Sequence, residues 1–128
     1  MALRVRRAAG GPDRTAIFDG LGVYRILAEA PDPAGVERFV REWLGALFEY
    51  DARKKTELVE TLSTYFECGR NYNATAKALV MHRNTLKYRL HRIREISGHD
   101  LADADTQFNL QLATRAWHTL QALRDDGA

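Results

Sequence analysis

The feature that most constrains this chain is a pair of helical patterns joined by a very short connection. Residues 73–79 (NATAKAL) have the spacing of a short helix, and a second pattern runs from residue 82 or 83 to Ser97, where Gly98 stops it. On a helix of 3.6 residues per turn, three residues of the second pattern fall within about 60° of one another and define its buried face. They are Leu86, Leu90 and Ile93. Two helices joined by a turn of three or four residues predict a helix-turn-helix.

The rest of the chain also has helical spacing, and no stretch alternates long enough to predict a strand. Further helices are expected over about residues 21–30, 34–48, 54–68 and 105–123. Four residues are expected at helix ends: Asp19, Asp32 and Asn73 as N-caps, and Gly69 after a C-terminus. The apolar residues expected to face inward in the last helix are Phe108, Leu112, Ala116, Leu120 and Leu123. The sequence therefore predicts an all-α fold of about six helices.

Charge is distributed unevenly along the chain. The net charge is only +2, yet residues 70–94 contain seven Lys and Arg side chains and no Asp or Glu. A basic run is usually a solvated helix face, but here the remaining segments mix their signs and this one does not. Such asymmetry is the electrostatic footprint of a polyanion binder.

Composition excludes several other classes of protein. No apolar run approaches the roughly 18 residues that span a bilayer, and the basic start has no apolar segment of a signal peptide behind it. The single Cys68 excludes an internal disulfide and a cysteine-based zinc site, and a reducing, cytoplasmic location fits. The sequence holds no nucleophile motif, phosphate-binding glycine loop or metal-ligand cluster. We therefore expect neither an enzyme nor a cofactor.

The helical wheel shows which side chains the second helix offers to a partner. The N-terminal residues of that helix enter the major groove in motifs of this kind. The residues placed to touch DNA are His82, Arg83, Asn84, Thr85, Lys87 and Tyr88, with His91 on the same outer face. Arg can chelate a guanine edge, Asn can pair with adenine, and Lys and Tyr commonly hold phosphates. The expected clamps on the phosphate backbone are Arg70, Lys77, Arg92 and Arg94.

These residues also carry a resemblance. The stretch "NATAKALVMHRNTLKYRLHRIREISGHDL" closely resembles the C-terminal helix-turn-helix of the PucR family of bacterial transcriptional regulators, and "HRNTLKYRL" is its most specific part. The second helix is also similar to that of the Fis-type nucleoid proteins. The resemblance implies a transcriptional regulator's DNA-binding domain at residues 53–128, a helical linker or support segment at 15–52, and an arm or stump at 1–14. It also implies an upstream effector-sensing region that this chain does not contain, so we expect a fragment of a longer regulator or a stand-alone remnant.

One residue departs from the pattern of such motifs. Helix-turn-helix turns often carry Gly where this chain has Val80. Because a β-branched residue tolerates a positive φ poorly, a more helical turn and a shifted crossing of the two helices are expected here.

Two functional interpretations stay open. The first is a sequence-specific binder of double-stranded DNA, acting in the cytoplasm on the nucleoid as a homodimer whose half-sites lie about 34 Å or a multiple apart. Candidates for its dimer surface are aromatic residues of the second or last helix, although both helices fit the core better than an interface: Phe39, Trp43, Phe48 and Trp117. The second is a helical protein-interaction module whose basic face binds an acidic partner. RNA is a weaker alternative, because nothing here resembles an aromatic-bearing sheet or a GXXG loop.

Overall fold

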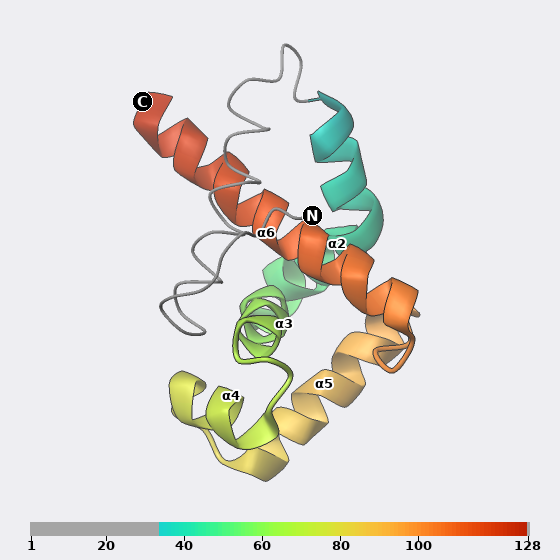
Figure 1. The fold of residues 1–128 in the computed structure, drawn as a ribbon, viewed down its shortest axis with the longest axis vertical. Coiled ribbons are helices and arrows are strands. Elements are labelled where there is room, and N and C mark those ends of the chain that lie inside the picture. Colours follow the sequence, from blue (N-terminus) through green and yellow to red (C-terminus); the bar gives the residue numbers. More distant parts are fainter. Residues whose placement is uncertain (1–33, 128) are drawn as a thin grey trace, which may run out of the picture. The chain divides into compact units, whose positions relative to one another are not determined.

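The computed structural model describes residues 34–127, and every regular element in that part of the chain is an α-helix (Figure 1). The helices are α2 (Ala34–Lys54), α3 (Leu58–Glu67), α4 (Tyr72–Leu79), α5 (Arg83–Ser97) and α6 (Ala104–Gly127). The predicted all-α fold with a helix-turn-helix is confirmed. The helix expected over residues 21–30, the caps Asp19 and Asp32, and the arm 1–14 lie outside the described residues.

The chain divides into two compact units, one of residues 1–38 with 115–128 and one of residues 39–114. Among the described residues, the first unit holds the start of α2 and the C-terminal half of α6. In it, Arg124 of α6 forms an exposed ion pair with Glu37 of α2 at 3.2 Å. The second unit holds the rest of α2, the start of α6 and the three helices between them, including the helix-turn-helix.

The helix α2 is longer than expected, and α3 begins later. The sequence predicted helices over 34–48 and 54–68, whereas α2 continues to Lys54 and α3 starts at Leu58. Residues 49–54 (EYDARK) contain mostly good helix formers, and two cations close to the C-terminus of α2 favour its extension. Asp51, in the last turn of α2, then sets the start of α3, because its carboxylate accepts hydrogen bonds from the first α3 amides.

The central helix of the second unit is α3, which is buried on most sides and packs against both α4 and α5. Its buried residues are Leu58, Val59, Thr61, Leu62, Ser63, Tyr65 and Phe66. Gly69 follows the helix with φ +67, and the amide of Arg70 donates to the carbonyl of Tyr65 at 2.8 Å. The predicted glycine stop of this helix is therefore confirmed.

The buried face of α6 differs from the predicted one. Leu110, Ala113 and Thr114 are buried in the second unit, whereas Phe108 is 66% exposed and was wrongly predicted to face inward. Phe108 precedes Leu110 by two positions, which turns its side chain by about 200° around the helix. Ala116 and Leu120 are buried as expected, while Leu112 and Leu123 are half-buried.

Candidate nucleic-acid interface

The N-cap of the short helix α4 is Asn71 rather than Asn73, two residues before the predicted cap, so the helix begins at Tyr72. The Asn71 side chain accepts a hydrogen bond from the amide of Ala74 at 2.8 Å. The carbonyl of Asn71 also accepts a hydrogen bond from the Thr75 hydroxyl at 2.7 Å. An Asn side chain can cap a helix from position 71 as well as from position 73. Only the backbone geometry therefore identifies the cap.

The turn between α4 and α5 contradicts the expectation that it would be more helical. Val80 adopts the left-handed conformation with φ 54 and ψ 53, the geometry that glycine usually supplies at this point. The amide of Met81 donates to the carbonyl of Ala76 at 2.9 Å, which closes the helix end. The Val80 side chain is 90% exposed and packs against little. The turn is therefore sharp, and Val80 makes it in a strained conformation.

The helix α5 has the boundaries that the sequence predicted. It starts at Arg83, and the Nδ1 atom of its N-cap His82 accepts from the Asn84 amide at 3.2 Å. It ends at Ser97, where Gly98 has φ 76 and its amide donates to the Arg94 carbonyl at 2.8 Å. The predicted buried stripe is confirmed. It consists of Leu86, Leu90 and Ile93, which are at most 5% exposed.

The residues predicted to contact DNA lie on the outer side of the motif. Packing of α5 against α3 and α4 occupies its opposite side (Figure 1). Arg92 is half-buried, and the other ten predicted residues are exposed: Arg70, Lys77, His82, Arg83, Asn84, Thr85, Lys87, Tyr88, His91 and Arg94. Tyr88 is 64% exposed although it is aromatic, so it is not a core residue of the described structure.

The positive charge of this surface is largely uncompensated. Between residues 34 and 127, Lys77, Lys87 and Arg94 form no ion pair. The single acid of α5 is Glu95, close to its C-terminus, and it is held by His91 at 3.3 Å and by Arg92 at 2.9 Å. The hydrogen bond from Arg92 lowers the pKa of Glu95, which therefore stays ionised. The first three turns of α5 thus present cations and neutral polar groups alone.

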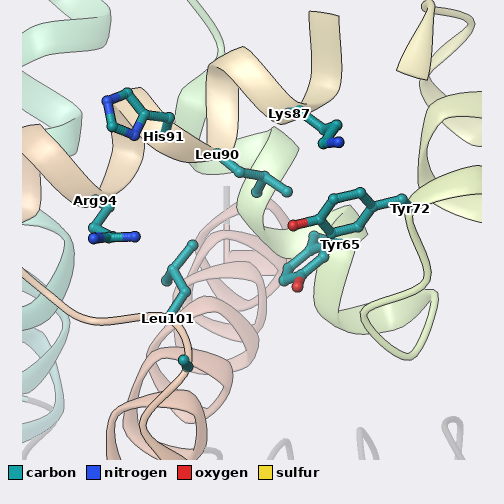
Figure 2. Close-up of a pocket in the computed structure, with 8 residues that line it drawn as sticks. Tyr65, Tyr72, Lys87, Leu90, His91, Arg94 and Leu101 are labelled. Atoms are coloured by element: carbon teal, nitrogen blue, oxygen red, sulfur yellow. The ribbon is translucent and has the colours of Figure 1, made fainter. Parts of the chain in front are cut away.

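One flank of α5 borders a pocket of about 280 Å³. Figure 2 shows the rings of Tyr65 and Tyr72 at one end of this pocket and Arg94 at the other, with Leu90 between them. Lys87 and His91 also line it. The Tyr72 ring has two close neighbours: the tilted ring of Tyr65, with ring centres 6.0 Å apart, and the Arg83 guanidinium, 5.5 Å from the Tyr72 ring centre. Burial raises the pKa of the Tyr65 hydroxyl, so it remains a neutral donor at the base of this cationic flank.

The other flank of α5 borders a groove of about 490 Å³ that also involves the connection between α2 and α3. Arg92 lies in it, and its guanidinium donates to the hydroxyl of Tyr50 at 2.9 Å. This hydrogen bond and the one to Glu95 raise the pKa of Arg92 further above its already high range. Arg89 is half-buried and lines the same groove.

Sequence reasoning missed the contribution of Tyr50 and Lys55 to this flank. Tyr50 lies 42 residues before Arg92, and no periodic pattern connects the two positions. Lys55 has φ 58 and follows α2 directly, so the turn that ends α2 determines where its side chain points. The local sequence "EYDARKK" contains no signal that could have assigned either residue to the motif.

The dimensions of α5 suit a nucleic-acid duplex. A helix with its side chains is about 10–12 Å across, and the major groove of B-DNA is about 12 Å wide. With its outer face in the groove, α5 would carry Lys87 and Arg94 toward one strand and Arg92 toward the other. Such an arrangement can hold phosphates on both sides and read bases between them.

The described residues contain neither a metal-binding cluster nor a membrane-spanning helix. Within them, no group of three or more His, Cys, Asp or Glu side chains could hold a metal ion. None of the described helices combines the length and the apolar character needed to cross a bilayer.

Comparison with known proteins identifies the motif. The profile of the PucR C-terminal helix-turn-helix domain matches residues 58–116, which comprise α3, α4, α5 and the first part of α6. No solved structure matches the chain significantly.

Several curated proteins are similar to most of the chain. The DNA-binding transcriptional activator AdeR of Bacillus subtilis is 35% identical over 104 residues, 79% of this chain and 24% of the relative. The transcriptional activator PmfR of Paenarthrobacter nicotinovorans is 45% identical over 100 residues, 78% of this chain and 20% of the relative. The purine catabolism regulatory protein of B. subtilis is 38% identical over 80 residues, 62% of this chain and 15% of the relative.

The chain thus spans no more than about a quarter of the length of these three relatives. All three relatives are regulators by name. The profile match and these identities agree with the resemblance found in the sequence alone. Residues 58–116 therefore form a helix-turn-helix domain of the PucR C-terminal type.

Proposed function

We propose that this chain binds double-stranded DNA with α5 in the major groove and is the DNA-binding part of a transcriptional regulator, without enzymatic activity. The observation that carries the proposal is the outer face of α5. It combines exposed base-reading side chains such as Asn84 and Thr85 with cations on both flanks, and its first three turns contain no acid. The names of AdeR and PmfR, both transcriptional activators, support the same function.

Each side chain has a specific role in the proposed complex. Arg83 and Asn84, at the start of α5, are placed to contact base edges, while Thr85 can meet a thymine methyl or a phosphate. Lys87 and Tyr88 hold phosphates, and Arg70, Lys77, Arg92 and Arg94 act as clamps on the backbone. His82 and His91 lie on the same surface and can donate to phosphate oxygens. The polarity of α5 adds an electropositive N-terminus.

A single motif covers few base pairs, so we infer that the protein acts as a homodimer on two half-sites. Two aromatic residues of the expected dimer surface, Phe39 and Trp43, have ring contacts within the chain. Trp43 stacks on His99 at 4.4 Å and contacts Phe39 at 6.4 Å within the same unit, so these rings already have partners in the chain. The upstream region of a longer regulator would then provide further dimer contacts and the sensing of an effector, in the cytoplasm and on the nucleoid.

Fluorescence anisotropy of this chain with a labelled mixed-sequence duplex, measured across a salt series, tests the proposal. Neutralising Z phosphates gives a log–log slope near −0.9Z, and we expect a slope of about −3 to −6. Arg83→Glu should abolish binding. Arg41→Glu makes the same charge change at an exposed position of α2 outside the motif and should have little effect.

Failure of the chain to bind at low salt would be followed by the same measurement on an artificially dimerised version. Binding by the dimerised version supports the proposal and shows that affinity depends on dimerisation. If the dimerised version also fails, DNA binding is ruled out, and the basic face of α5 would instead serve an acidic protein partner.

A further inference from the structure

The groove between α5 and the α2–α3 connection is formed in part by residues outside the helix-turn-helix motif, and nothing in the motif requires it. Tyr50 and Lys55 line it from the α2 side, and Thr85, Arg89 and Arg92 line it from α5. Three of these five side chains are cations, and Glu57 is the single acid among the lining residues. The two residues from the α2 side precede residues 58–116, the segment that matches the family profile.

Arg92 is fixed in this groove by contacts on two sides. Its Nη2 atom donates to the Tyr50 hydroxyl at 2.9 Å, and its Nη1 atom donates to Glu95 at 2.9 Å. The guanidinium also lies 5.2 Å from the centre of the Tyr50 ring. A guanidinium has five N–H donors, so these two hydrogen bonds leave the others available. The Arg92 side chain is 32% exposed, which keeps this remaining part accessible.

The helix dipole of α3 offers no competing anion site on this flank. The amides of Leu58 and Val59 at the start of α3 already donate to the Asp51 carboxylate, at 2.8 and 3.1 Å. An anion in the groove would therefore be held by side chains. The exposed hydroxyl of Thr85 and the cations Lys55 and Arg89 lie around Arg92 and could share this role.

We propose that this groove seats a phosphate of the DNA backbone, with Arg92 as its main ligand and Tyr50 as the residue that positions Arg92. The proposal rests on the DNA-binding function proposed above. With α5 in the major groove, the strand on this side passes along the groove, and a guanidinium fixed beforehand loses little conformational freedom when it meets a phosphate. The DNA-binding unit would then begin within α2, at or before Tyr50, and α2 would be part of the DNA contact surface.

A double-mutant cycle in the full chain tests the positioning role, with a labelled duplex of about 30 base pairs, or about three helical turns, as the probe. Arg92→Ala should weaken binding and reduce the magnitude of the salt slope by about 1, because one phosphate contact is lost. Tyr50→Phe keeps the ring and all charges, so it should weaken binding about three- to tenfold while the salt slope stays unchanged. In the Arg92→Ala background, Tyr50→Phe should have no further effect on affinity.

A matched lysine pair provides a second test that does not depend on the stability of the Tyr50 variant. Lys55 lines the groove, and its neighbour Lys54 is equally exposed but does not. Lys55→Gln should reduce the magnitude of the salt slope, whereas Lys54→Gln should leave it unchanged. Circular dichroism and urea midpoints of each variant would confirm that all of them are folded.

Two results would overturn the proposal. One is an unchanged salt slope in both Arg92→Ala and Lys55→Gln, which would show that the groove stays empty in the complex. The other is a loss of affinity on Tyr50→Phe that is equally large without Arg92, which would show a purely structural role for Tyr50. Either result leaves the proposed function intact if the wild-type chain binds DNA. If neither the wild-type chain nor the dimerised version binds DNA, both the proposed function and the proposed phosphate site are ruled out.

Discussion

Asp51 and Leu58 connect two helices through a side chain and a backbone amide. The Oδ1 atom of Asp51, in the last turn of α2, accepts a hydrogen bond from the amide of Leu58, the first residue of α3, at 2.8 Å. The Oδ2 atom accepts from the next amide, that of Val59, at 3.1 Å, and the Thr56 hydroxyl also donates to Oδ1. One carboxylate thus caps α3 and fixes the direction in which the chain leaves α2.

We expect Asp51→Ala to destabilise the second unit. The substitution leaves two amides at the start of α3 and the Thr56 hydroxyl without their partner, and loss of an N-cap costs about 0.5–2 kcal/mol. Urea denaturation followed by far-UV circular dichroism measures the change in the free energy of unfolding. Glu49→Ala, an exposed acid two positions earlier on α2, is the control. Equal stability of the Asp51 and Glu49 variants would show that the cap contributes nothing.

Val80→Gly should stabilise the fold. Val80 has φ 54, and a left-handed conformation costs an L-residue about 1–2 kcal/mol, part of which is offset by the greater freedom of glycine in the unfolded chain. A net gain of about 0.5–1 kcal/mol in the free energy of unfolding is therefore expected. Val80→Ala removes the branched side chain but keeps Cβ, so it should recover less of the strain. Thermal unfolding of the three proteins decides the order, and a destabilised glycine variant would contradict the argument.

Two further substitutions should distinguish base reading from phosphate binding. Asn84→Ala removes an amide from the exposed start of α5, so it should reduce discrimination at one base position of a selected site, by about 1–3 kcal/mol. Lys77→Ala removes from α4 a cation that forms no ion pair within residues 34–127, so it should weaken binding to all sequences alike and reduce the magnitude of the salt slope by about 1. Competition among single-base variants of the site measures base discrimination and overall affinity, and the salt series measures the slope. A uniform loss of affinity on Asn84→Ala would mean that Asn84 does not read a base.

His99 should contribute to the pH dependence of stability. It stacks on Trp43 at 4.4 Å, and burial lowers the pKa of its imidazole below the ordinary value. As the pH falls, the unfolded chain therefore takes up this proton first, at about pH 6.5, and folding stability declines until the folded imidazole is also protonated. His99→Phe keeps an aromatic ring against Trp43 and removes the titration. When the pH is lowered from 7.5 to 5, the melting temperature of the wild type should fall more than that of His99→Phe. A difference that does not change with pH would contradict this assignment.

The motif itself could be predicted in detail from the sequence, because its signals are local. The spacing of Leu86, Leu90 and Ile93 defined the buried face of α5, and Gly69 and Gly98 marked the ends of α3 and α5. The acid-free run from Arg70 to Arg94 predicted a surface suited to a polyanion, and the structure leaves most of its cations exposed. Periodicity, composition and glycine at helix ends depend on residues within a few positions of one another. They can therefore be recognised without knowledge of the fold.

Other features were decided by tertiary contacts. Asn71 and Asn73 are equivalent as cap residues in the sequence, Val80 is an unfavourable residue for the turn it makes, and the register of α6 leaves Phe108 exposed. Packing of α3, α4 and α5 requires the sharp turn at Val80 and overrides the local preference of valine for another conformation.

The residues around Arg92 show most clearly what the sequence determines and what the tertiary structure adds. The sequence alone determined that α5 carries this arginine beside its outer face and that the surrounding segment is positively charged. Only the tertiary structure brought Tyr50 and Lys55 to the same groove, although Tyr50 lies 42 residues away along the chain. Helix periodicity reports which side of a helix a residue occupies, whereas the hydrogen bond from Arg92 to Tyr50 depends on where the last turn of α2 ends. Asp51 and the positive φ of Lys55 fix the direction in which the chain leaves α2, and helix periodicity does not report that direction.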